Sequence, residues 1–359
     1  MDLKLTDEQR QLQMLVRQYC RDRFERQDGS LGQPATAETW LQLAALGLLD
    51  LAAGTSPATG IVEQVIVADE LGRALLCTEY APAVAYTIPI LSATADELLP
   101  AVTAGRRRVS FGSGGKNVHS SGQSLSGDWD LVPSFSPADH YLLAEGTSSP
   151  ARIWVADAAQ PEIGTEKLTS IDLAGTMQSL RLARAPARLV ASLTAERLRE
   201  LDTRARLLLA AELAGVADAA IAAAADYANV RTTFGHVIGS YQAISHPLAD
   251  SLAQVEGLRS LIYWTACQME AGDSEATRLS LAVKARAGDV AVQATERALH
   301  TFGGIGFTWE HPIHRYYRRA IAANATAGPS FQLSHQLGLD LLASFASSPE
   351  HSSQEDDLY

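Results

Sequence analysis

The sequence predicts a mainly α-helical protein of the α+β class, in which a small β-domain separates two helical regions. Apolar residues recur with a helical period at the start of the chain and again after Ser192, whereas short β-prone runs separated by Gly, Ser, Pro and Asp lie between them. A chain of 359 residues also exceeds what one hydrophobic core usually supports. We therefore expect an N-terminal α-helical domain (1–104), a middle β-domain (105–192), a C-terminal helical bundle (193–345) and an acidic, disordered tail (346–359).

The N-terminal region opens with a helix start signal. Thr6 and Gln9 have the spacing of a capping box, and apolar residues follow on one face, which predicts an amphipathic helix over 6–26. A second helix is expected to end at Gly47, because glycine is the preferred residue just beyond a helix C-terminus. This second helix is expected to begin at residue 40. The remaining helices of this region are expected at 61–76, 83–91 and 96–103.

The middle region has the texture of a small β-domain. Its β-prone runs begin near Val109, Tyr141, Ile153 and Ser179, and turn-forming residues separate them. Short runs with such punctuation predict a small antiparallel sheet or barrel. Helical periodicity with broad apolar faces then returns, as the interior of a helix bundle requires. The bundle helices are expected at roughly 195–230, 240–271, 274–302 and 312–343.

Composition and charge exclude some classes of partner. The formal net charge of −12 would repel the phosphates of a nucleic acid, so we expect no nucleic-acid partner. Hydrophobic residues make up 47% of the chain and charged residues only 19%, which is typical of a well-buried globular protein.

The cysteines and the first residues of the chain indicate the cellular compartment of the protein. Cys20, Cys77 and Cys267 lie in helical segments without CxxC spacing, which indicates a reducing compartment and buried thiols rather than disulfides or zinc. The first residues lack the basic and apolar regions of a secretory signal. Charged residues interrupt even the alanine-rich stretch 207–225, so we expect no membrane span and a cytoplasmic protein.

Two clusters in the C-terminal half carry the strongest functional signal. Arg231 is followed at close spacing by Phe234 and Gly235, a combination suited to a phosphate and a flat ring. Gly303 and Gly304 interrupt a helical background and allow backbone N–H groups to approach a ligand. The glycines lie between helices rather than after a strand, so they are not a Rossmann fingerprint. Together the clusters indicate a bound dinucleotide.

The order of regions and motifs resembles the acyl-CoA dehydrogenase family, from Leu5 to about Leu342. The segments that carry the resemblance are Leu5–Gln9, Trp40–Leu48, Asp69–Ala74, Arg231–Gly235, Gln242–Asp250, Lys284–Ala285 and Gly303–Phe307. The family fold comprises an N-terminal α-domain, a middle β-domain and a C-terminal four-helix bundle, and it usually assembles as a tetramer around FAD. Its members oxidise an acyl-CoA thioester to the trans-2-enoyl form, with a carboxylate base taking the α-proton.

The resemblance assigns cofactor-binding roles. It implies that Arg231 binds the FAD pyrophosphate of a neighbouring subunit, and that Phe234, Gly303 and Gly304 support the adenosine half. Two further cofactor-binding candidates, Gln242 and His300, follow from the same motifs. His300 stands where the family usually has glutamine, and packing in the core or an interface is its alternative role.

The catalytic base of the family is missing from both of its known positions. Ala327 occupies the place of the usual glutamate, and Ala205, just before Arg206, occupies the place used by a minority of the family. An alanine methyl group cannot accept a proton, so we expect no catalytic residue in this chain. Glu212, two turns further on, is a low-probability substitute whose other role is a solvated or ion-paired helix residue.

The flavin-facing stretches of the β-domain are also not recognisable. The corresponding segments read Ser110–Asn117 and Trp129–Ser134. Ser113, Ser134 and Ser136 remain as hydroxyls able to bond a flavin, although turn serines are the plainer interpretation. His311 and His314 have a one-face helical spacing but no third ligand, so we predict no metal site.

This selective loss is similar to the non-catalytic partner subunits of heterotetrameric (α2β2) acyl-CoA dehydrogenases in actinobacterial sterol side-chain degradation. The resemblance implies a partner subunit that bears the glutamate, an acyl-CoA substrate such as a steroid side-chain thioester, and electron-transfer flavoprotein or a similar acceptor. Two alternatives stay open. One is a homomeric acyl-CoA or acyl-carrier dehydrogenase with a relocated base, and the other is a flavin-free scaffold or interaction subunit.

Overall fold

The computed structural model describes residues 4–24, 31–32, 35–54, 60–76, 79–133, 137–145, 150–173, 175 and 177–346. Cys77, Ser134 and Ser136 lie outside these ranges, as does the predicted tail from residue 347 onward. Residue 346 belongs to the last helix rather than to the tail. The described part of the chain is mainly helical, with strands confined to the middle region and one short hairpin.

The N-terminal region is helical, as the sequence predicts. Its elements are α1 (Asp7–Phe24), α2 (Ala37–Ala45), η1 (Asp50–Ala52), α3 (Ile61–Arg73), α4 (Tyr80–Pro82), η2 (Ala83–Thr87), α5 (Ile88–Ala93) and α6 (Leu99–Thr103). The capping box is confirmed, because Thr6 Oγ1 accepts a bond from the Gln9 N–H at 3.2 Å and Gln9 Oε1 accepts one from the Thr6 N–H at 3.0 Å. Gly47 has φ +75°, as a residue just past a helix end requires. The expected regular helix at 83–91 is wrong in detail, since η2 is a π-helical turn.

The middle region forms two four-stranded sheets. Its strands are β1 (Val109–Gly112), β2 (Lys116–Ser121), β3 (Ser124–Pro133), β4 (His140–Glu145), β5 (Ala151–Asp157), β6 (Ile163–Lys167), β7 (Met177–Pro186) and β8 (Arg188–Leu193). One sheet has the order β1-β4-β5-β8 and the other β2-β3-β7-β6. The prediction of one small antiparallel sheet is corrected in two respects, because there are two sheets and β1 pairs with β4 in parallel. Buried residues of both sheets, including Trp129 and Trp154, share one core.

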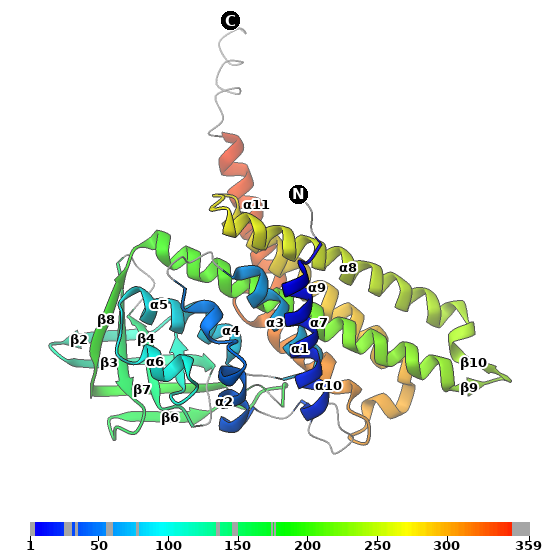
Figure 1. Ribbon diagram of the computed structural model, residues 1–359, viewed down its shortest axis with the longest axis horizontal. Helices are drawn as coiled ribbons and strands as arrows, with labels where there is room; N and C mark the ends of the chain where they lie inside the picture. Colours follow the sequence, from blue (N-terminus) through cyan, green and yellow to red (C-terminus); the bar gives the residue numbers. More distant parts are fainter. Residues whose placement is uncertain are drawn as a thin grey trace, which may run out of the picture.

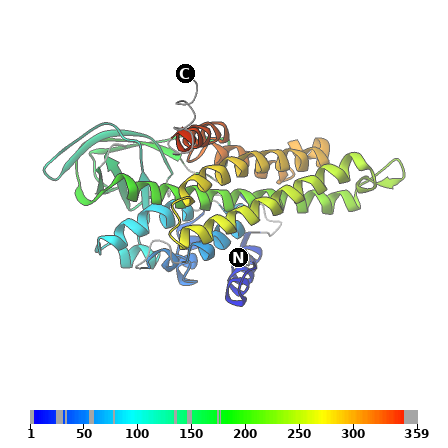
Figure 2. The same cartoon turned by 90° about the horizontal axis from the view of Figure 1, so that it is seen from above.

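The C-terminal region is a bundle of long helices. Its elements are α7 (Ala195–Val230), β9 (Thr232–Thr233), β10 (His236–Val237), η3 (Ile238–Ser240), α8 (Gln242–Glu270), α9 (Ala276–Phe302), η4 (Gly303–Phe307), α10 (Ile313–Ala325) and α11 (Ser330–Ala346). Helices α7, α8 and α9 lie side by side along the long axis of the molecule (Figure 2). The β-domain lies at one end of α7, and the β9–β10 hairpin lies at the other end (Figure 1).

Helix α7 is long and apolar enough to cross a membrane by length and composition, so the expectation that no run reaches that length is wrong. However, 72% of its most apolar window is buried inside the fold. Its leucines and alanines pack against α3, α8, α9 and α10, and this packing accounts for the composition.

Helices α3 and α7 approach each other closely through two glycines. A Cβ on Gly215 of α7 would lie 2.0 Å from the Asp69 carbonyl oxygen, and one on Gly72 of α3 would lie 2.2 Å from the Glu212 carbonyl oxygen. No real Cβ tolerates these distances. The two backbones are therefore in direct contact, which fixes the N-terminal domain against the bundle.

Buried ion pairs reinforce the same contact. Arg259 of α8 donates to Asp69 of α3 from Nε at 2.9 Å and to Asp218 of α7 from a terminal nitrogen at 3.1 Å. Arg17 of α1 donates to Glu70 from Nε at 2.9 Å. The Asp69 and Glu70 side chains are 4% and 1% exposed, so removing one partner would strand a buried charge.

The close backbone contact at Gly215 leads to a prediction about the stability of the fold. Gly215→Ala should lower the free energy of unfolding by ~1–3 kcal/mol or more, because the added methyl group overpacks a backbone contact. Gly257→Ala in α8 is the matched control, since a Cβ there meets nothing within 4 Å, and it should raise stability by up to ~1 kcal/mol. Urea unfolding of both variants measures the difference, and an equally stable Gly215→Ala protein would contradict the close contact.

Candidate functional site

The two clusters singled out in the sequence meet in one pocket at the hairpin end of the bundle. This terminal pocket has a volume of about 490 Å³ and lies between the end of α7, the start of α8 and the end of α9. Its lining residues are Tyr227, Arg231, Thr233, Phe234, Ile238, Tyr241, Ala243, Ile244, Thr301, Phe302, Gly303 and Gly304. Four of the six predicted cofactor-binding residues are therefore brought together, although they come from segments some seventy residues apart.

Arg231 is placed as the C-cap of α7. Its carbonyl oxygen accepts the Ile238 N–H at 2.8 Å, which closes the hairpin beneath it. Its side chain is exposed and has no ion pair or hydrogen bond within the described residues. A guanidinium held in place by its backbone and left without an anion is suited to bind a phosphate.

Phe234 lies at the tip of the hairpin in an unusual conformation. It has φ +53°, in the left-handed region, and 91% of its surface is exposed. Such a backbone is uncommon for a bulky residue, and an exposed aromatic ring is costly in water. The positive φ values of Phe234 and Gly235 are those of a two-residue hairpin turn, and the exposed ring is available for a contact outside this chain.

The glycine side of the pocket is open. Gly303 has φ +62°, which favours glycine, and no atom of the described chain lies within 4 Å of a Cβ built on Gly303 or Gly304. Beside them, Phe302 stacks on Tyr227 with ring centroids 4.4 Å apart and on His311 with centroids 4.3 Å apart. The pocket therefore offers bare backbone and an aromatic wall, which fit a nucleotide.

Gln242 and His300 flank the pocket rather than line it. Gln242 is the first residue of α8, between two lining residues, and His300 is in the last turn of α9, directly before Thr301. The His300 ring contacts Phe307 edge to face, with centroids 6.3 Å apart. Their predicted cofactor contacts stay predictions.

The turn to which the resemblance assigns the base is built around Ala327. Ala327 has φ +56° and Gly328 has φ +102°, so the alanine adopts a strained left-handed backbone. Asn324 Oδ1 accepts bonds from the Ser330 N–H at 3.3 Å and from the Ser330 hydroxyl at 2.8 Å. Gly288 of α9 leaves room for this pair, because a Cβ there would lie 2.1 Å from Asn324 Oδ1.

Lys284 connects the two alanine positions. Its Nζ donates to the Asn324 carbonyl at 3.1 Å and to the Gly328 carbonyl at 3.4 Å, beside Ala327. It also lies close enough to Arg206, the neighbour of Ala205, to feel its charge. Burial lowers the pKa of Lys284 to about 8, with Glu212 opposing and Arg206 adding to the shift. Both positions of the missing base thus belong to one buried cationic region.

The buried ammonium group of Lys284 predicts that the free energy of unfolding depends on pH. Because the folded pKa of about 8 lies below the ordinary value of 10.5, the unfolded chain binds more protons between these values. The contribution of Lys284 to the free energy of unfolding should therefore rise with pH from about 8 to 10.5, by at most ~3 kcal/mol.

Unfolding of the wild type and of Lys284→Met at a series of pH values isolates this contribution. The exposed Lys167→Met exchange is the control and should show no comparable rise. A constant difference between wild type and Lys284→Met across this range would contradict the buried charge.

Glu212 is ion-paired, which agrees with its alternative role in the sequence prediction. Its Oε1 accepts the Arg319 Nε–H at 2.7 Å and a second bond from the same guanidinium, while Arg319 also donates to Asp172 of the β-domain at 2.9 Å. Glu79 lies near this group, and burial raises its pKa to about 8. Glu212 would have to leave its arginine before it could accept a substrate proton.

The stretch to which the resemblance assigns the flavin contact is closely packed within this chain. Phe111 of β1 is 4% exposed and stacks on Tyr86 of η2, with ring centroids 4.3 Å apart. A Cβ on Gly115 would lie 2.7 Å from the Trp129 ring, so this stretch is close-packed. Ser113 is exposed. The β-domain therefore shows no set of hydroxyls gathered to bind a ring within its described residues.

A pair that the sequence does not predict lies beside Ala205. Tyr86 donates its hydroxyl hydrogen bond to Asp202 Oδ1 at 2.8 Å, linking η2 to α7. Burial raises the pKa of Asp202, while Arg206 opposes the shift, and burial raises the pKa of Tyr86 still more strongly. The two residues are 116 positions apart, and neither lies in a motif.

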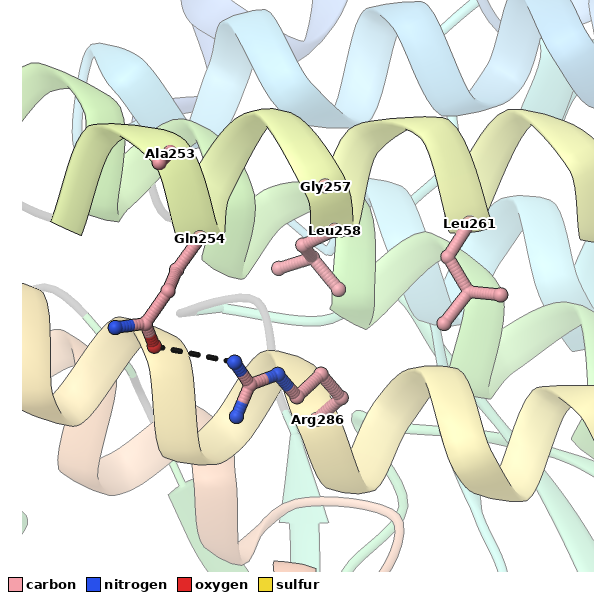
Figure 3. A pocket seen from close by; sticks show the side chains of 6 residues that line it. All are labelled: Ala253, Gln254, Gly257, Leu258, Leu261 and Arg286. Carbon is pink, nitrogen blue, oxygen red and sulfur yellow. Dashed lines mark hydrogen bonds between the residues drawn. The ribbon is translucent and has the colours of Figure 1, made fainter. Parts of the chain in front are cut away.

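A second hollow lies between α8 and α9 (Figure 3). It has a volume of about 400 Å³ and is lined by Ala253, Gln254, Gly257, Leu258, Leu261 and Arg286. Arg286 donates to Gln254 Oε1 at 3.1 Å across its edge. With aliphatic walls and a single paired charge, it is a packing surface rather than a chemical site.

The described residues offer little support for a metal site or for a reactive thiol. No group of three or more His, Cys, Asp or Glu in them is able to hold a metal ion. Cys20 and Cys267 are free thiols, and burial raises the pKa of Cys267. His311 Nδ1 accepts the Ile313 N–H at 3.2 Å, and His314 contacts the Trp309 ring edge to face.

Known proteins agree with this architecture. The family profile described as acyl-CoA dehydrogenase, C-terminal domain, matches residues 177–333. Acyl-CoA dehydrogenase FadE34 of Mycobacterium tuberculosis is 31% identical over 347 residues, which cover 91% of this chain but 47% of FadE34, so the chain spans about half of that relative.

Solved structures extend the likeness to the whole fold. A variant of the Tcur3481-Tcur3483 steroid ACAD has a TM-score of 0.80 and 27% identity, and the match covers 95% of this chain and 99% of that one. The ChsE4-ChsE5 complex from Mycobacterium tuberculosis has a TM-score of 0.83 at 24% identity, covering 97% and 100%. The chain belongs to the acyl-CoA dehydrogenase family, whose members are oxidoreductases acting on CH–CH bonds and are typically flavoproteins.

Proposed function

We propose that this chain is the non-catalytic subunit of a heteromeric, FAD-dependent acyl-CoA dehydrogenase. It contributes cofactor-binding residues at the terminal pocket, and a partner chain of the same family supplies the glutamate that removes the α-proton. The bound flavin would accept the hydride from the β-carbon of the acyl-CoA thioester.

The contrast between the two sites carries this proposal. At the terminal pocket the Arg231 side chain has no partner among the described residues, Phe234 is exposed, and the backbone at Gly303 and Gly304 is uncovered. At the turn, the geometry of the base position is held by Lys284 and Asn324, but the residue there is alanine. Residues aimed outward are retained, whereas residues needed for chemistry in this chain are absent.

The terminal pocket fits part of a dinucleotide. Arg231 would hold the pyrophosphate, and Phe234 with the bare glycine backbone would support the adenosine. Phe234 points away from its own chain, so the cofactor would lie across the boundary with the partner. The similarity to the two-component steroid ACAD supports a heteromeric enzyme and a bulky acyl-CoA such as a steroid side-chain thioester. Electron-transfer flavoprotein or a similar acceptor would reoxidise the flavin, and a cytoplasmic location is part of the proposal.

Flavin content tests the proposed role of Arg231. The chain purified alone should carry little FAD, and co-expression with a family member bearing glutamate at the positions matching Ala327 or Ala205 should give a yellow complex with about one FAD per pair. Arg231→Ala in that complex should weaken FAD retention at least ~10-fold, since a charge-assisted bond to phosphate is lost.

Arg278→Ala is a matched control, because among the described residues Arg278 pairs only with Glu275, the N-cap residue of its own helix. It should leave the flavin content unchanged. A yellow, active homo-oligomer of this chain alone would overturn the proposal. Unchanged flavin content and turnover in Arg231→Ala would favour the flavin-free scaffold instead.

Turnover of the complex tests the relocated base. Glu212→Gln should change kcat less than about threefold, because the Glu212 carboxylate is bound to Arg319 and remote from proton transfer in the proposed enzyme. The measurement is steady-state dehydrogenation by the co-purified complex. Complete loss of turnover with an intact fold would favour a base in this chain.

A further inference from the structure

Helix α11 carries an apolar stripe that the described residues leave uncovered. The helix packs on α9 through Leu333, which is buried against Leu281 and Ala285. Its later turns project past the bundle (Figure 1). On the side that faces away from α9, large apolar side chains are each more than half exposed, and a glycine lies between them. We call this set the α11 stripe: Phe331, Gly338, Leu342 and Phe345.

The stripe makes α11 poorly suited to water. Its members follow Phe331 by seven, eleven and fourteen residues, so they lie on one face of the helix. Asp340 is the only residue of α11 with a formal charge, and it lies on the opposite face. Helices in proteins gain most of their stability from packing an apolar face. We therefore expect another molecule to cover the stripe.

Gly338 indicates that a second helix covers it. Glycine weakens the interior of a helix, yet a Cβ on Gly338 would meet nothing within 4 Å, so no packing inside this chain requires a glycine here. Glycine on an apolar face lets another backbone approach closely. The same device operates inside this fold at Gly215, where α3 and α7 are in direct contact.

The stripe is symmetrical about Gly338, and this symmetry identifies the covering helix. Phe331 lies seven residues before the glycine and Phe345 lies seven residues after it. If two α11 helices cross antiparallel at Gly338, Phe331 of each copy meets Phe345 of the other around one two-fold axis. Leu342 of each copy then meets Ser334 of the other, and no two like charges face each other. The stripe is therefore complementary to itself.

We propose that α11 docks antiparallel on the α11 helix of a second copy of this chain, with the two helices crossing at Gly338. With the flanking Leu339 and Leu341, the contact would bury on the order of 1,000 Å² of apolar surface in total. That area is the lower limit for a specific interface, so we expect a dissociation constant in the micromolar range. Because the helices are antiparallel, the two bundles lie at opposite ends of the pair and do not collide.

Sedimentation velocity of the full-length chain tests the self-association. Between about 1 and 100 µM the chain should show a reversible equilibrium of monomer and dimer. Phe345→Glu should raise the dissociation constant at least ~10-fold, because dimerisation would then bury an unpaired charge. Gln336→Glu is the matched control, since it adds the same charge at an exposed position on the other side of α11, and it should dimerise as the wild type does. Thermal unfolding of both variants distinguishes loss of the contact from loss of the fold.

Cysteine cross-linking tests the antiparallel register. A mixture of Phe331→Cys and Phe345→Cys chains should be joined by a short bismaleimide, because the two positions face each other across the pair. Either variant alone should give no such product, since its own counterpart would lie about 20 Å away along the helix axes. The wild type is the control for reaction at its native cysteines, Cys20, Cys77 and Cys267.

Three results would each overturn the proposal. They are a chain that stays monomeric at about 100 µM, a dimer that Phe345→Glu leaves unchanged, and cross-linking that is as frequent in the single variants as in the mixture. If the proposed function holds, the contact joins two heterodimers through their copies of this chain. The contact itself requires neither flavin nor the glutamate-bearing partner, so its tests are independent of the flavin and co-expression tests.

Discussion

The direct backbone contact between α3 and α7 is the constraint on which the remaining structure depends. Gly72 and Gly215 allow it, and the buried carboxylates Asp69 and Glu70 hold it through arginines from α1 and α8. The chain that follows α3 is thereby held against α7, and η2 brings Tyr86 to Asp202. The Tyr86–Asp202 hydrogen bond therefore depends on this contact.

The molecule separates two tasks along the length of α7. The β-domain end carries the Tyr86–Asp202 pair, and the region around Lys284 and the strained turn lies between it and the hairpin end, which carries the terminal pocket (Figure 1). The turn keeps its hydrogen bonds around an alanine, so its backbone is stabilised independently of any catalytic side chain. In the proposed enzyme, this arrangement would allow a subunit without the base to retain its fold and its contribution to a neighbouring site.

Much of the fold and of the terminal pocket could be predicted from sequence, for identifiable reasons. The capping box at Thr6 is local, and the helical period of the bundle is long and regular. Arg231 and the double glycine stand out because they interrupt an alanine- and leucine-rich background. The parallel pairing of β1 with β4 could not be predicted, because strand partners are chosen by the packing of the whole sheet. The membrane-like composition of α7 is likewise explained only by its packing within the bundle.

The Tyr86–Asp202 hydrogen bond is a contact that could not be predicted from the sequence. A tyrosine in a π-helical turn and an aspartate near the start of a long helix carry no shared motif, and only folding brings their oxygens to hydrogen-bond distance. Similarly, the sequence leaves Glu212 either as a substitute base or as a solvated or ion-paired residue, and only the structure identifies Arg319 as its partner. Residues that act through partners distant in sequence need the structure to be identified.

The exposed Phe234 ring at the hairpin tip affects how long the unassembled chain would persist in a cell. Phe307 and Trp309, which are 64% and 66% exposed, lie in the nearby segment after α9, so an unassembled copy presents several large apolar side chains at one end. Such surfaces are recognised by chaperones and proteases and favour aggregation. An orphan copy would therefore be short-lived, and the amount of this protein would follow the amount of whatever covers that end. In the proposed heteromer, the two chains would therefore have to be synthesised in matched quantities.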